Sequence, residues 1–67
     1  MTQTDQFRDI KVLFGTLDDL NQERRKLYTE WGTGKMAPPA FGVEMTENLR
    51  RTREAASAME KLLSGGG

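Results

Sequence analysis

The stretch Gly32-Thr33-Gly34-Lys35 shares residue types with a phosphate-binding loop. In that loop, backbone N–H groups and a lysine hold the phosphates, and the motif needs a preceding strand, an earlier glycine and a Ser or Thr after the lysine. Here Thr29 stands where the earlier glycine should be, Met36 follows the lysine, and the preceding residues have a helical pattern. The sequence therefore argues against phosphate binding of this type.

Glu44 and Glu47 have the spacing of carboxylate metal ligands in helical bundles. Such sites also use histidine, and the chain contains neither His nor Cys. Because Arg50 and Arg51 follow closely, ion pairing is the expected role of these glutamates. Ser, Thr and Lys residues stand at no spacing that suggests a nucleophile with its base. We therefore expect no catalytic residue, no metal site, no cofactor and no small-molecule substrate, and hence no enzymatic activity.

Basic residues gather in two short segments that an antiparallel hairpin would bring to nearly the same height. This arginine belt consists of Arg24, Arg25, Arg50, Arg51 and Arg53, with Lys26 beside it. Such a belt could contact phosphates along a nucleic acid or an acidic partner. However, glutamates interleave the same segments, no aromatic residue accompanies the arginines for base stacking, and ten Lys and Arg balance ten Asp and Glu. A solvated, ion-paired surface is therefore the favoured interpretation, and nucleic-acid binding is the alternative.

The segment from Trp31 to Phe41 divides the chain into two helical halves. It contains two glycines and two adjacent prolines, a combination through which an ordinary helix cannot continue. We expect either Gly32 or Gly34 to end the first helix in the left-handed conformation. The sequence predicts one all-α domain over residues 1–67, an antiparallel two-helix hairpin with helices at about 5–31 and 39–63, a turn at 32–38 and a flexible tail at 64–67.

The first helix has a wide apolar surface. Its main stripe advances in steps of three and four and comprises Phe7, Ile10, Phe14, Leu17, Tyr28 and Trp31. A flanking row, Leu13, Leu20 and Leu27, repeats every seven residues. Asn21 and Arg24 interrupt the main stripe. Either Asn21 fixes register and oligomeric state, or the helix is rotated so that Leu20 and Leu27 form the core while Asn21 and Arg24 lie at its edge; the second interpretation is favoured.

The second helix has a stripe of its own, with small side chains at the centre. The stripe comprises Met45, Leu49, Thr52, Ala56, Met59 and Leu63, flanked by Phe41, Ala55 and Leu62. Folding back about the turn places the small centre opposite Leu17 and Leu20, which allows the two helix axes to approach closely. At the far end, Phe7 and Ile10 are expected to meet Leu62 and Leu63.

The chain is short and polar for a self-sufficient core. It has 67 residues, of which 36% are hydrophobic and 30% charged, and it has no cysteine for disulfides. Domains of this size usually need a further source of stability, such as oligomerisation. We therefore expect the hairpin to dimerise into a four-helix bundle or to bind another protein. The expected association face consists of Phe7, Ile10, Phe14, Leu17, Leu20, Met45, Leu49, Met59 and Leu63.

The turn offers a second candidate contact, made by Trp31, Met36, Pro38 and Phe41. These side chains either close the hairpin core or dock a partner protein. No apolar run approaches the length of a membrane span, so we expect a cytoplasmic protein that does not contact membranes. The predicted function is that of a non-enzymatic interaction module, such as an adaptor, inhibitor or assembly chaperone. The alternative is a small dimeric nucleic-acid-binding regulator.

No residue motif identifies a family. In size and helix pattern the predicted hairpin is similar to the plasmid copy-number Rop protein, which dimerises into a four-helix bundle and binds RNA. It is also similar to the hairpin co-chaperones of type III secretion needle subunits. These resemblances imply the same two functions, regulation through nucleic acid and protection of a partner helix.

Overall fold

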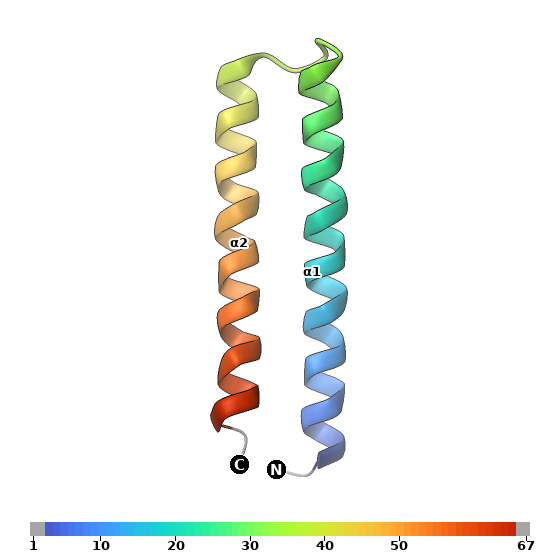
Figure 1. Cartoon of the computed structure of the whole chain (residues 1–67), viewed down its shortest axis with the longest axis vertical. Coiled ribbons are helices and arrows are strands. Elements are labelled where there is room, and N and C mark those ends of the chain that lie inside the picture. The colour runs from blue at the N-terminus through green and yellow to red at the C-terminus, as the bar shows by residue number, and fades with distance from the viewer. Residues whose placement is uncertain (1–2, 66–67) are drawn as a thin grey trace.

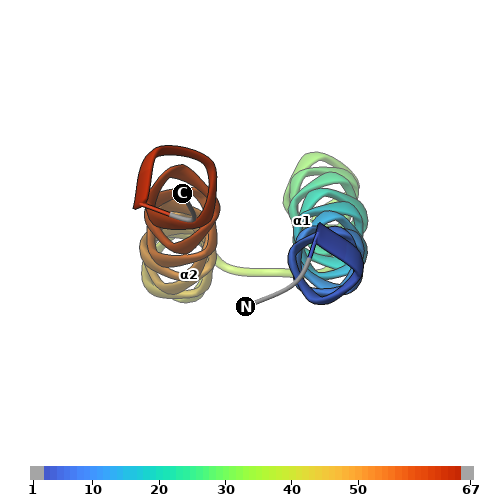
Figure 2. The ribbon, with the colours of Figure 1, turned by 90° about the horizontal axis from the view of Figure 1, so that it is seen from below.

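The computed structural model describes residues 3–65, which form two antiparallel helices joined by a short turn (Figure 1). Helix α1 spans Gln3–Gly32 and helix α2 spans Pro38–Gly65. They lie side by side along a hairpin 48 Å long, as the view along the helices also shows (Figure 2). The predicted all-α hairpin is confirmed. Ser64 and Gly65 belong to α2 instead of a flexible tail, and residues 66–67 of that expected tail lie outside the described residues.

The turn begins with a hydrogen-bonded cap at the end of α1. Of the two candidate glycines, Gly34 adopts the left-handed conformation, with φ of 81°. The N–H of Lys35 donates to the carbonyl of Glu30 at 2.8 Å, and the N–H of Gly34 donates to the carbonyl of Trp31 at 3.2 Å. This pair of bonds is a Schellman motif. Pro38 then opens α2, where a missing N–H costs nothing because that donor has no helical acceptor.

The helices meet along a seam whose positions advance in steps of three and four. The seam consists of Ile10, Leu13, Leu17, Leu20, Arg24, Leu27 and Trp31 from α1 and Phe41, Met45, Asn48, Thr52, Ala55, Met59 and Leu62 from α2. All of these except Trp31 are buried or half-buried. The ring stack of Trp31 with Phe41 and the hydrogen bond of Arg24 with Asn48 show which residues lie at equal heights. In this register Leu17 lies opposite the small Ala55.

The structure corrects the expected packing face. Phe7 and Phe14, predicted on the packed stripe of α1, are 69% and 56% exposed, whereas Leu20 and Leu27 of the flanking row are 6% exposed. The favoured rotation of α1 therefore holds for Leu20 and Leu27, but Arg24, expected at the edge of the core, lies in the seam because Asn48 and Thr52 of α2 accept its hydrogen bonds. Leu63, expected to meet Phe7 inside the hairpin, is also exposed. The physical reason is that α1 has three adjacent apolar rows, and one neighbouring helix can cover only two of them.

The centre of the seam is polar. Asn48 is 1% exposed, the lowest value in the described part of the chain. Its Nδ2 donates to the carbonyl of Leu20 at 2.9 Å and to Oε2 of Glu23 at 3.3 Å, and its Oδ1 accepts from Nη1 of Arg24 at 3.0 Å. The same Nη1 donates to Oγ1 of Thr52 at 2.7 Å. Within residues 3–65, every buried side-chain nitrogen or oxygen has a hydrogen-bond partner.

A second amide crosses the seam near the open end of the hairpin. Nε2 of Gln6 donates to the carbonyl of Leu62 at 2.8 Å. Gln6 stands two heptads before Leu20, and Leu62 stands two heptads after Asn48, so the two inter-helix amide bonds report the same register. Both hydrogen bonds join a side-chain amide of one helix to a backbone carbonyl of the other, so they favour one register of the two helices.

Replacing Asn48 with Ala is expected to destabilise the hairpin by about 1–3 kcal/mol, because Arg24 loses an acceptor in a half-buried position. The double change Asn48→Leu with Arg24→Leu should recover most of this loss, since an apolar pair replaces a polar one. Urea unfolding followed by circular dichroism at one fixed protein concentration measures both effects. Ser57→Ala, at an exposed position of α2, is the control. Equal losses in the single and double variants would contradict this account.

Candidate interaction surface

One side of the hairpin is apolar along most of its length. This apolar face consists of Phe7, Phe14 and Tyr28 from α1 and Leu49, Ala56 and Leu63 from α2. In the sequence, each of these residues stands four positions after a seam residue. Phe7 is the exception, and it stands seven positions before Phe14. In antiparallel helices, the same displacement from the seam places both rows on the same side. Tyr28 and Leu63 are each 64% exposed. Apolar surfaces of this extent mark contact sites with other molecules.

The opposite side of the seam is charged. Two shallow grooves run there, and the charged side chains that line them are Asp9, Asp19, Glu23 and Glu54 together with Arg51 and Lys61. Acidic groups come mostly from α1 and basic groups from α2. Apolar residues such as Leu13 and Val12 also line these grooves, but this side carries more charged side chains than the apolar face does.

The expected association residues divide between the seam and the apolar face. Phe7, Phe14, Leu49 and Leu63 lie on the apolar face, while Ile10, Leu17, Met45 and Met59 are half-buried seam residues along its inner edge. Leu20 is a correction: it is buried between the two helices, so it stabilises the hairpin itself and presents no surface to a partner.

The aromatic residues near the turn pack on one another. The rings of Trp31 and Phe41 stack with centroids 4.7 Å apart and 16° between their planes. Tyr28 lies beside Trp31 at 6.1 Å with a tilted ring. The stack joins α1 to α2 and closes the seam, although Trp31 remains 41% exposed. Of the other expected turn contacts, Met36 is half-buried and Pro38 is exposed.

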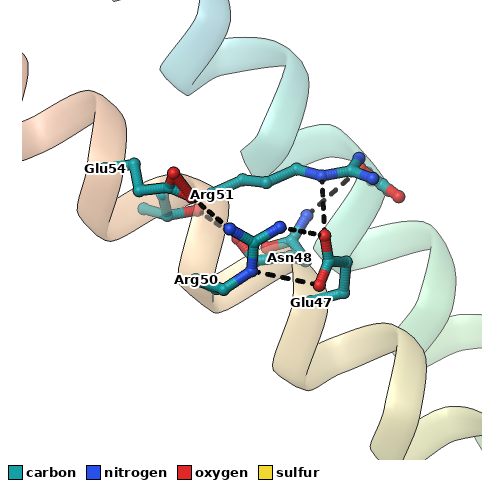
Figure 3. Close-up of polar contacts among 7 residues, drawn as sticks. Glu47, Asn48, Arg50, Arg51 and Glu54 are labelled. Atoms are coloured by element: carbon teal, nitrogen blue, oxygen red, sulfur yellow. Dashed lines mark hydrogen bonds and ion pairs between the residues drawn. The ribbon is translucent and has the colours of Figure 1, made fainter.

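The arginines of the belt point in different directions. Arg24 is part of the seam, whereas Arg50 and Arg51 pair with glutamates of their own helix (Figure 3). Arg50 lies between Glu47 and Glu54; its Nε is 3.2 Å from Oε2 of Glu47 and its Nη1 is 2.5 Å from Oε1 of Glu54. Nε of Arg51 is 3.3 Å from Oε1 of Glu47.

Arg25 and Arg53 are exposed on the outer borders of the apolar face, one on each helix. The structure therefore does not gather the arginine belt into one basic patch. The guanidinium groups of Arg50 and Arg51 are already paired with the carboxylates of Glu47 and Glu54, which lowers the attraction that this region offers to an anion.

Sequence reasoning missed the two seam amides, Gln6 and Asn48. Asn48 stands seven residues after Phe41 and seven before Ala55, so the heptad row that passes through it was visible in the sequence. A hydropathy pattern hides such a residue because it marks polar side chains as solvent-facing.

Comparison with protein-family models, with curated protein sequences and with solved structures finds no match to this chain. In the part of the chain that the structure describes, neither helix is long and apolar enough to cross a bilayer. Between Gln3 and Gly65 there is no group of three acidic, His or Cys side chains that could hold a metal ion.

The ion pairs of Glu47 should contribute a pH-dependent part of the stability. The hydrogen bond from Arg50 lowers the pKa of the Glu47 carboxyl below its ordinary 4.5, and the same contact raises the pKa of Arg50. A lowered pKa in the folded state means that the contribution is present above pH 4.5 and is lost as pH falls through the folded pKa. The effect should be small and should weaken with salt, because the groups are exposed.

Glu47→Gln tests this assignment. The difference in unfolding free energy between the parent chain and the variant should shrink as pH is lowered from neutral, measured by denaturant unfolding at low ionic strength. Glu44→Gln, an exposed change on the same helix, serves as the control. A difference that stays constant across the acid range would show that Glu47 acts through something other than its charge.

Proposed function

We propose that this chain is a non-enzymatic protein–protein interaction module, such as an adaptor, inhibitor or assembly chaperone, that covers its apolar face with helices of another chain. The observation that carries the proposal is the apolar face itself, where Phe7, Phe14, Tyr28 and Leu63 are all more than half exposed. A monomeric hairpin would leave these large side chains in water.

The energetic argument follows from apolar burial. Covering one large apolar side chain contributes about 1.5–3 kcal/mol, so several on one face can exceed the ordering costs of association. The residues are also of the right kind, since aromatic side chains are enriched among those that dominate binding energy. The half-buried edge formed by Ile10, Leu17, Met45 and Met59 would extend the contact inward to the seam.

Nucleic-acid binding through the arginine belt receives less support. It needs free guanidinium groups on one surface, whereas Arg50 and Arg51 contact carboxylates and Arg24 donates its hydrogen bonds inside the hairpin. This alternative predicts binding that weakens steeply as salt is raised. The apolar face predicts association that persists in salt.

Phe14→Glu should weaken association about tenfold or more, because it places a charge on the surface that becomes buried. The matched control is Val12→Glu, the same kind of change on the same helix. Val12 is 64% exposed but lines the charged side of the hairpin. Light scattering coupled to size exclusion over a range of micromolar concentrations measures the association. Equal behaviour of the two variants would exclude the apolar face as the contact.

A further inference from the structure

We infer that the partner is a second copy of this chain, placed with its turn at the same end, so that α1 of each hairpin packs antiparallel against α2 of the other. The two copies are then related by a two-fold axis parallel to the helices, and the product is a four-helix bundle. This inference rests on the proposed function, because it names what covers the apolar face.

The symmetry leaves no freedom to slide one hairpin along the other. Rotation about an axis parallel to the helices does not change the height of any atom along that axis. Residues of α1 therefore meet those residues of the second copy's α2 that lie at equal height within one hairpin. The contacts of Trp31 with Phe41 and of Arg24 with Asn48 define these heights.

The sizes of the facing side chains are complementary in this arrangement. Phe14 comes opposite Ala56 of the second copy, and Tyr28 comes opposite Gly42, where nothing lies within 4 Å of the position of a Cβ. Phe7 comes opposite Leu63 at the open end. At Phe14 and Tyr28 a large side chain of α1 thus meets a small residue of α2, as the interdigitation of close-packed helices requires, and at the open end two large apolar side chains meet. Only Asn21, opposite Leu49, is a mismatched position.

The borders of the apolar face have complementary charges. On α1 the border consists of Lys11, Asp18 and Arg25, and on α2 it consists of Thr46, Arg53 and Glu60, all exposed. At matching heights Lys11 lies by Glu60 of the second copy and Asp18 lies by Arg53. Arg25 lies by the neutral Thr46. The two-fold axis repeats each pair, so the dimer has opposite charges facing along both of its new helix contacts.

The arrangement with turns at opposite ends fits less well. When the ends of the two hairpins are level, Asp18 of one copy faces Asp18 of the other, and Arg53 faces Arg53. Like charges at an interface are unfavourable. Sliding one hairpin by about one heptad restores opposite charges, but it then stacks Phe14 on Phe14 and leaves Tyr28 beyond the end of the contact.

Charge reversal tests the pairing. Asp18→Lys should raise the dimer dissociation constant about tenfold, because it creates two repulsive contacts with Arg53, and adding Arg53→Glu should restore it. Asp19→Lys, the same change on the charged side of the same helix, should have little effect. If the double variant associates no better than Asp18→Lys alone, the proposed pairing is wrong. Sedimentation equilibrium at low salt provides the constants.

The orientation can be read directly from a distance. The chain has no cysteine, so Lys35→Cys, in the exposed turn, can be labelled with a nitroxide at one site per copy. With turns at the same end the two labels should lie roughly 10–25 Å apart, as expected for neighbouring helices carrying flexible labels. With turns at opposite ends they should be separated by nearly the 48 Å length of the hairpin. Pulsed dipolar spectroscopy on the frozen protein distinguishes the two.

The outcomes separate this inference from the proposed function. A dimer with the short distance supports both. A dimer with the long distance overturns the orientation, yet leaves the interaction module in place if Phe14→Glu still disrupts association. A chain that stays monomeric at every concentration overturns the second-copy inference. A dimer that is insensitive to Phe14→Glu overturns both.

Discussion

The side-chain amide of Asn48 is the contact on which the geometry of the hairpin depends. It is held by the backbone carbonyl of Leu20, by Glu23 and by the guanidinium of Arg24, all from the facing helix. Sliding the helices by one heptad would move this amide next to a different leucine and take both acceptors on α2, Asn48 and Thr52, away from Arg24. Because unsatisfied buried polar groups are costly, one register is strongly preferred over its neighbours. A purely apolar seam would discriminate less between registers.

The seam also determines where the largest apolar side chains lie. In an isolated hairpin each helix packs only two rows of side chains against the other helix. The two rows of α2 include Ala55, Thr52 and Asn48, which are small or polar. Small side chains bring the axes close together but contribute little apolar burial. The aromatic side chains of Phe7, Phe14 and Tyr28 therefore remain outside. The seam thus combines close packing with polar contacts, and several large apolar side chains are left exposed on one face.

The fold was predictable because its signals are local. The two glycines and two prolines of the turn, and equal helical halves on either side, are enough to predict the hairpin. The packing face was not predictable to the same degree, because Phe7 and Phe14 continue the spacing of Ile10 and Leu17 as regularly as Leu20 does. Periodicity identifies three apolar rows, and only the approach of α2 decides which two are covered. Asn48 was missed because its burial depends on partners from the other helix.

In the proposed dimer, affinity and orientation come from different residues. The apolar face would supply most of the free energy of association, but apolar contacts tolerate more than one arrangement. The exposed charges of Lys11, Asp18, Arg53 and Glu60 add little affinity, since such pairs are weak in water. Their effect is to penalise alternatives, because the opposite orientation faces like charges when the ends are flush. The amide of Asn48 also selects against alternative arrangements, because it fixes the register of α1 and α2 within each hairpin. That register sets the heights at which the border charges of the two copies meet.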